Sequence, residues 1–137
     1  MKTVFVFLCA LVAVLARGLP NLPENERLKL AEVHRSCQSN PKTFCNEDKL
    51  RNLFNNINDP QVGTHMLCMA VKAGLMRPNG DFDLPYMKQK IGLVVRDPSK
   101  VDGLVQKCTR KAENPGKTAN LMWKCLVEND IQYYHNL

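Results

Sequence analysis

The sequence predicts an all-α fold of about six short helices. Three observations support this: strand patterns are nearly absent, apolar residues recur at intervals of three and four, and proline, glycine and asparagine separate these amphipathic segments. A chain of 137 residues is long enough for one domain with a single modest core. No internal repeat interrupts the pattern, so we expect one helical domain.

The N-terminus has the pattern of a secretory signal peptide. A short basic start precedes the uncharged apolar run Val4–Ala16. This run is shorter than the about 20 apolar residues of a transmembrane helix, so an uncleaved anchor is the less favoured alternative. Cleavage is expected after Ala16 or after Gly18, which assigns residues 1–18 to the leader and residues 19–137 to a secreted, extracellular domain.

The charge balance and the motifs argue against several function classes. The net charge is +6 at pH 7 and the basic residues are spread along the chain, which does not predict nucleic-acid recognition. The nucleophile elbow, the His-Glu-x-x-His motif and the phosphate loop are all missing, so we expect neither an enzyme nor a cofactor. A basic amphipathic surface fits an alternative class, a secreted interaction or defence protein without a ligand cavity.

The central predicted helix covers residues 60–73 and has clear start and stop signals. Asp59 can accept a backbone N–H as N-cap, and Pro60 fits the first helical position. Gly74 can adopt the left-handed conformation just past the end. One face is apolar along its whole length, because five residues recur at helical spacing: Val62, Met66, Met69, Ala70 and Ala73.

Five further helices are expected around this central one. Asn46 is the expected N-cap of the second helix, Asp97-Pro98 opens the fifth, and Asn114-Pro115-Gly116 breaks the chain before the sixth. Gly92 lies inside the fourth helix and can bend it. The apolar tail, residues 131–137, is expected to fold back on the body. The predicted ranges are 24–38, 47–55, 83–95, 97–112 and 117–130.

Five cysteines follow the leader, and in an oxidising compartment an odd count suggests two disulfides and one remaining thiol. Cys108 and Cys125 lie on the inward faces of the fifth and sixth helices, and a bridge between them contributes about 3 kcal/mol. Cys37 and Cys68 lie inward on the first and central helices. Cys45 is expected to be a buried thiol, although a Cys45–Cys68 pairing stays open.

Two histidines precede cysteines by one helical turn, His34 before Cys37 and His65 before Cys68. A zinc site of these four side chains is therefore an alternative to a disulfide, but a secreted chain favours the disulfide and no metal. The same two histidines lead to a second hypothesis, release of a ligand that depends on pH.

The cysteine pattern resembles that of the insect odorant-binding proteins. Cys68 stands six residues before Gly74, and the family's turn of the type Asn-Gly-x-Phe follows at residues 79–82. The family's second and fifth cysteines, which pair with each other, fall here on Thr64 and Gly116. The chain is therefore similar to the minus-C branch of the family, which keeps the other two bridges, and the resemblance implies the pairs Cys37–Cys68 and Cys108–Cys125 here.

This resemblance implies a compact bundle of about six helices, stapled by two disulfides around an internal apolar cavity. It implies a secreted insect carrier in olfaction and transport, which holds small hydrophobic molecules such as odorants, pheromones or other semiochemicals and lipids. The expected fluid is sensillar lymph or haemolymph, the expected state is a monomer or weak homodimer, and a membrane odorant receptor is an indirect partner. The implied ligand-binding residues are Met66, Met69, Ala70, Ala73, Leu93, Val94, Leu104, Val105, Met122, Trp123, Leu126, Tyr133 and Tyr134.

Overall fold

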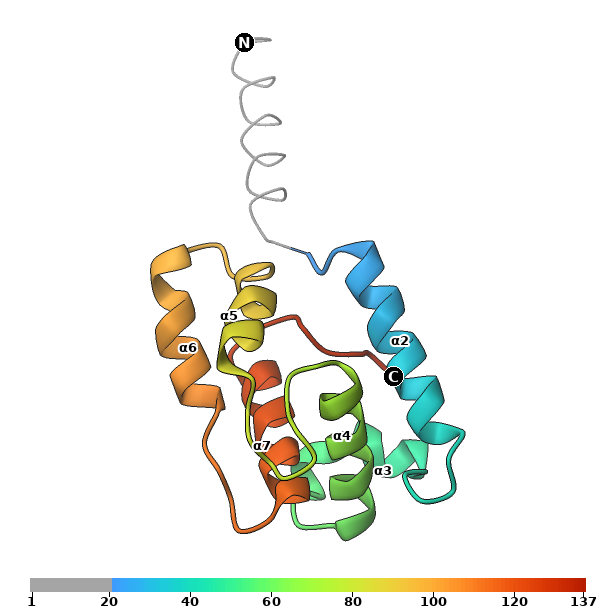
Figure 1. The fold of residues 1–137 in the computed structure, drawn as a ribbon. Coiled ribbons are helices and arrows are strands. Elements are labelled where there is room, and N and C mark those ends of the chain that lie inside the picture. The colour runs from blue at the N-terminus through green and yellow to red at the C-terminus, as the bar shows by residue number, and fades with distance from the viewer. Residues whose placement is uncertain (1–20) are drawn as a thin grey trace, which may run out of the picture.

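The computed structural model describes residues 21–137, and the predicted leader lies outside them. Figure 1 shows this part of the chain as a bundle of helices, with the C-terminal tail crossing from α7 to α2. The one β-bridge in the described region joins Met76 to Phe82, and no helix there is long and apolar enough to cross a membrane. The elements are α2 (Glu24–Gln38), α3 (Glu47–Arg51), η1 (Leu53–Asn55), α4 (Pro60–Lys72), α5 (Leu84–Gly92), η2 (Pro98–Lys100), α6 (Val101–Cys108) and α7 (Pro115–Glu128).

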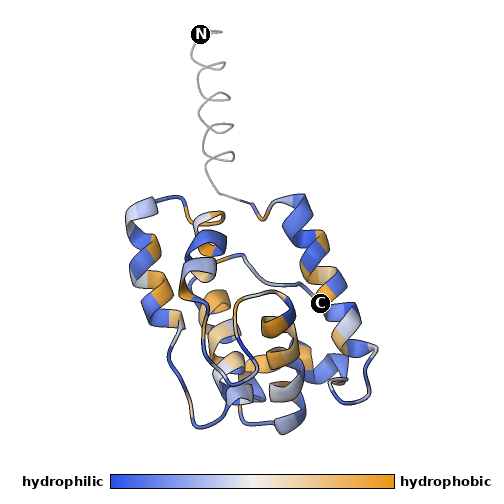
Figure 2. Cartoon of the chain, in the orientation of Figure 1, coloured by the Kyte–Doolittle hydropathy of each residue, from blue (hydrophilic) through white to orange (hydrophobic). Residues whose placement is uncertain are grey.

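Helix α4 lies at the centre and packs mainly against α7. Its predicted signals are confirmed: the Asp59 side chain accepts from two backbone N–H groups, Pro60 opens the helix, and Gly74 has φ +85°. Figure 2 shows hydrophobic residues gathered on α4 and α7, whereas α2 and α6 alternate between polar and apolar faces. The outer helices therefore bury one stripe each against a central apolar pair.

Two disulfides join four of the helices. Cys37 in α2 is bonded to Cys68 in α4, with Cα atoms 6.1 Å apart, and Cys108 in α6 is bonded to Cys125 in α7, with Cα atoms 5.4 Å apart. Both expected pairings are confirmed. Cys45 is a buried free thiol, and burial raises its pKa. The alternative Cys45–Cys68 pairing is therefore wrong.

Several predicted helix ends differ from the structure. The second predicted helix is two pieces, α3 and η1, because Asn52 between them leaves the helical region at φ −102° and ψ 37°. The fourth ends at Gly92 instead of residue 95. The fifth begins as η2 and ends at Cys108, where the Thr109 hydroxyl donates back to the Val105 carbonyl at 2.7 Å. The sixth begins at Pro115, two residues early, because Asn114 caps it.

Two glycines bring α4 and α7 into backbone contact. A Cβ atom built on Gly63 would lie 3.2 Å from the backbone of Gly116, and one built on Gly116 would lie 3.1 Å from the backbone of Gly63. By the resemblance drawn from the sequence, the absent cysteine pair is expected at Thr64 and Gly116. The close glycine contact involves Gly116 and lies next to Thr64.

Gly63→Ala is expected to lower the free energy of unfolding by about 1 to 2 kcal/mol. The added methyl meets backbone atoms, which typically costs about 1–3 kcal/mol, and the better helix propensity of alanine returns less than about 1 kcal/mol. The matched control is Gly103→Ala in α6, where a Cβ meets nothing within 4 Å, so this variant should gain stability. Urea unfolding measures both, and the same sign for the two variants would refute the packing argument.

Candidate functional site

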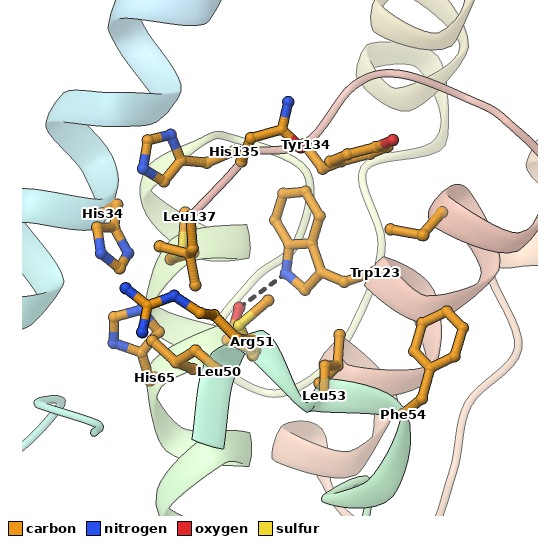
Figure 3. A pocket seen from close by; sticks show the side chains of 14 residues that line it. His34, Leu50, Arg51, Leu53, Phe54, His65, Trp123, Tyr134, His135 and Leu137 are labelled. Carbon is orange, nitrogen blue, oxygen red and sulfur yellow. Dashed lines mark hydrogen bonds between the residues drawn. The ribbon is translucent and has the colours of Figure 1, made fainter. Parts of the chain in front are cut away.

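A cavity of about 420 Å³ lies between the C-terminal tail and helices α2, α3, α4 and α7 (Figure 3). Small-molecule sites in proteins typically span about 300–1,000 Å³, so the volume suits a small ligand. A second hollow of about 420 Å³ beside the Gly63–Gly116 contact has mainly polar and loop residues around it. The first cavity is lined by His34, Leu50, Arg51, Leu53, Phe54, His65, Met66, Met69, Trp123, Val127, Tyr134, His135, Asn136 and Leu137.

Four of the residues expected from the family resemblance line this cavity: Met66, Met69, Trp123 and Tyr134. The other expected residues do not line it. Among these, Leu93 is 40% exposed and Leu104 is half-buried, whereas the remainder are buried in the core. That buried remainder comprises Ala70, Ala73, Val94, Val105, Met122, Leu126 and Tyr133.

Most of the other wall residues come from α2, α3, η1 and the end of the tail, and the family resemblance did not imply them. His65 in α4 and Val127 in α7 complete the wall. Some signal was available, because His34 continues the apolar stripe of Leu30, Val33 and Cys37 at helical spacing, and Leu50 and Leu53 are three residues apart in the helix predicted at 47–55. The tail residues His135 and Leu137 carried no such signal, because their position depends on where the tail crosses the bundle. The cavity therefore lies on the α2–α3 side of the central helix pair.

Trp123 forms one wall of the cavity and is tied to α4. The side chain is 2% exposed, and its indole N–H donates to the Met66 carbonyl oxygen at 3.0 Å, as the dashed line in Figure 3 shows. A buried indole needs such a partner, because an unpaired N–H is costly in an apolar setting. The hydrogen bond fixes the ring plane and so fixes the shape of the wall.

All three histidines of the chain meet at this cavity (Figure 3). The ring centroids of His34 and His65 are 5.2 Å apart, and those of His34 and His135 are 4.8 Å apart. Burial lowers the pKa of both His65 and His135, so both rings favour the neutral form. His34 and His65, the two residues of the hypothesis of pH-dependent release, both lie at the cavity. The hypothesis stays a prediction, and ligand affinity measured from neutral to mildly acidic pH tests it.

Two hydrogen bonds orient the inner pair of rings. His65 Nδ1 lies 2.9 Å from the Thr43 carbonyl oxygen, and His34 Nε2 lies 2.9 Å from the Glu47 carboxylate. Burial by itself raises the pKa of Glu47, but the hydrogen bonds from Gln38 and His34 outweigh burial and hold that pKa below its ordinary value. Glu47 is therefore a carboxylate that accepts from His34.

The zinc alternative does not fit this site. Cys37 and Cys68 are joined in a disulfide, so their sulfur atoms cannot serve as thiolate ligands. Among residues 21–137, no group of three or more His, Cys, Asp or Glu side chains is arranged to hold a metal ion.

Comparison with known proteins gives one family and two relatives. The profile of the PBP/GOBP family matches residues 21–129. The chain is similar to the B2 protein and the B1 protein of Tenebrio molitor, each 24% identical over 79 residues, or 58% of this chain. The matched part spans 62% and 61% of these relatives, less than two thirds of their length. No solved structure matches the chain.

Proposed function

The chain belongs to the PBP/GOBP family, and on this premise we propose that it is a carrier that holds one small hydrophobic molecule in the cavity beside Trp123. The observation that carries the proposal is the mainly apolar and aromatic wall of a cavity of suitable volume. The family is one of binding proteins, so the proposed role contains no chemical step. Ligands of the odorant, pheromone or lipid type fit such a wall.

The driving force in this proposal is removal of apolar ligand surface from water, worth about 25 cal/mol per Å². Each CH₂ group added to a ligand contributes about 0.8 kcal/mol while room remains, which is about fourfold in affinity. Proteins of this family are typically secreted. We therefore extend the proposal to transport through an extracellular fluid by a monomer or weak homodimer, with a membrane odorant receptor as an indirect partner.

A dye-displacement assay tests the carrier role. An environment-sensitive naphthylamine dye should gain fluorescence on binding, and straight-chain odorants should displace it with micromolar affinity that rises with chain length. Val127→Trp should abolish dye binding, because Val127 is half-buried and lines the cavity. Leu104→Trp is the matched control: Leu104 is also half-buried, but it does not line the cavity.

The outcomes distinguish three possibilities: a ligand site beside Trp123, a ligand site on the α5–α6 side, and no ligand site. Loss of dye binding in Val127→Trp alone supports the cavity proposed here. Loss in Leu104→Trp alone would move the ligand to the α5–α6 side of the bundle, where several residues implied by the family resemblance lie. A wild-type protein that binds neither dye nor odorant would contradict the carrier role and favour a protein that acts through its surface.

A further inference from the structure

Two ring nitrogens at the cavity are buried without a hydrogen-bond partner among residues 21–137: His34 Nδ1 and His65 Nε2. Both residues line the cavity, and His65 is fully buried. A buried polar atom without a partner costs about 1–3 kcal/mol, so such atoms are rare in folded proteins. Two on neighbouring rings, at one cavity, indicate a place where a polar ligand group supplies a hydrogen bond that the protein lacks.

The partner of His65 decides which kind of group it can bind. The Thr43 carbonyl oxygen can only accept, so His65 Nδ1 carries the hydrogen and donates it at 2.9 Å. Burial lowers the pKa of His65 and keeps the ring neutral at physiological pH. In a neutral ring the other nitrogen has no hydrogen. His65 Nε2 is therefore an acceptor, and its missing partner is a donor.

His34 presents the same chemistry in its neutral form. Its Nε2 donates to the Glu47 carboxylate at 2.9 Å, which leaves Nδ1 as an acceptor. The other ionisable side chains at the cavity are Tyr134, His135, whose ring lies 4.8 Å from that of His34, and Arg51, which donates to Asp48 at 2.9 Å. Two buried acceptors on adjacent rings thus lie at one end of a mainly apolar cavity.

We propose that the polar end of the bound molecule is a hydroxyl group, which donates its hydrogen to His65 Nε2 with His34 Nδ1 as the neighbouring acceptor. The ligand class is then aliphatic alcohols or phenols, with the hydrocarbon part against the apolar wall around Trp123 and Leu53. Aldehydes, ethers and esters of equal size carry acceptors only and leave both nitrogens unpaired. This inference rests on the proposed carrier function and specifies its ligand.

The experiment compares an alkan-1-ol with the methyl ether and the aldehyde of equal chain length, by dye displacement and calorimetry. Recovering the hydrogen bond of a buried acceptor is worth about 1–3 kcal/mol, so the alcohol should bind about tenfold more tightly. A site built for a hydroxyl rejects analogues that lack one. Equal binding of alcohol and ether would overturn the inference and leave the carrier function intact, whereas failure of all ligands and the dye would remove the carrier function itself.

Two variants locate the acceptor. His65→Asn can keep an amide N–H near the position of Nδ1, for the Thr43 carbonyl, and removes Nε2; His34→Gln can keep the contact to Glu47 and removes Nδ1. In His65→Asn the ratio of the alcohol affinity to the ether affinity should fall from about ten to about one, and His34→Gln should give a smaller fall. An unchanged advantage in His65→Asn would overturn the assignment.

A measurement on the unaltered protein covers the case in which His65→Asn does not fold. In a long-range ¹H–¹⁵N spectrum, the non-protonated nitrogen of His65 should move upfield when the alkanol is added, because it then accepts a hydrogen bond. The methyl ether should leave that signal in place. A His65 signal that responds equally to both compounds, or to neither while the dye is displaced, would refute the proposal.

Discussion

Replacing Glu26 by alanine is expected to lower the free energy of unfolding by about 3 to 5 kcal/mol, which is typical for breaking one side of a buried ion pair. Glu26 in α2 is 6% exposed and accepts hydrogen bonds from Lys90 in α5 and from the Tyr133 hydroxyl at 2.7 Å. Burial by itself raises the pKa of Glu26, but the bonds from Lys90 and Tyr133 outweigh it and hold the pKa low. Alanine leaves the Lys90 ammonium without its partner.

Urea unfolding of three variants tests this expectation. Glu24→Ala is the matched control, because Glu24 lies in the same helical turn, is mainly exposed and pairs only loosely with Arg27 at 3.6 Å. Lys90→Ala should cost about as much as Glu26→Ala, and the double variant should cost much less than the sum, because the pair acts as a unit. Additive losses, or a Glu26→Ala variant that unfolds like Glu24→Ala, would contradict a shared buried network.

Trp123→Ala is expected to cost about 3–5 kcal/mol of stability and to weaken dye binding strongly. The ring is almost fully buried between α7 and α4 and forms a wall of the cavity. Its removal merges the space of the ring with the cavity, so the ligand loses its closest apolar surface. Both effects have the same cause and should appear in the same variant.

Two variants separate the contributions of Trp123. Trp123→Phe keeps most of the apolar contact and removes the donation to the Met66 carbonyl, so it should cost about 1 kcal/mol. Phe54→Ala removes a ring from the rim of the same cavity, where Phe54 is 47% exposed, and should change stability far less. Thermal and urea unfolding with dye titration measure all three; a Trp123→Ala variant as stable as Phe54→Ala would refute the assigned role.

Local signals predicted the elements of the fold well. The first helix has the predicted bounds, Glu24–Gln38, and the Asp59-Pro60 and Gly74 signals lie at the ends of α4 as expected. The predicted ends failed where a side chain competes with the helix, as at Thr109, or where Asn114-Pro115, expected only to break the chain, also starts the next helix. At both positions the local sequence is compatible with more than one helix boundary, and the periodicity of apolar residues does not distinguish between them.

The site was less predictable because it depends on contacts between distant parts of the chain. In the sequence, Glu26 has the pattern of a first-turn acid that favours the helix dipole. In the structure, the same carboxylate holds Tyr133, 107 positions away, and so fixes where the tail crosses the bundle. The tail then brings His135 to His34 and closes one side of the cavity. Neither the contact of Glu26 with Tyr133 nor that of His34 with His135 can be predicted from a periodicity or a motif in the sequence.

The contact between Gly63 and Gly116 limits where a further disulfide can be added. A cysteine introduced at position 116 would carry its Cβ to 3.1 Å from the Gly63 backbone, so α4 and α7 would have to separate before a bond to position 64 could form. Gly116→Cys therefore loses packing before any covalent gain. Close backbone packing and a further disulfide exclude each other at this contact between α4 and α7.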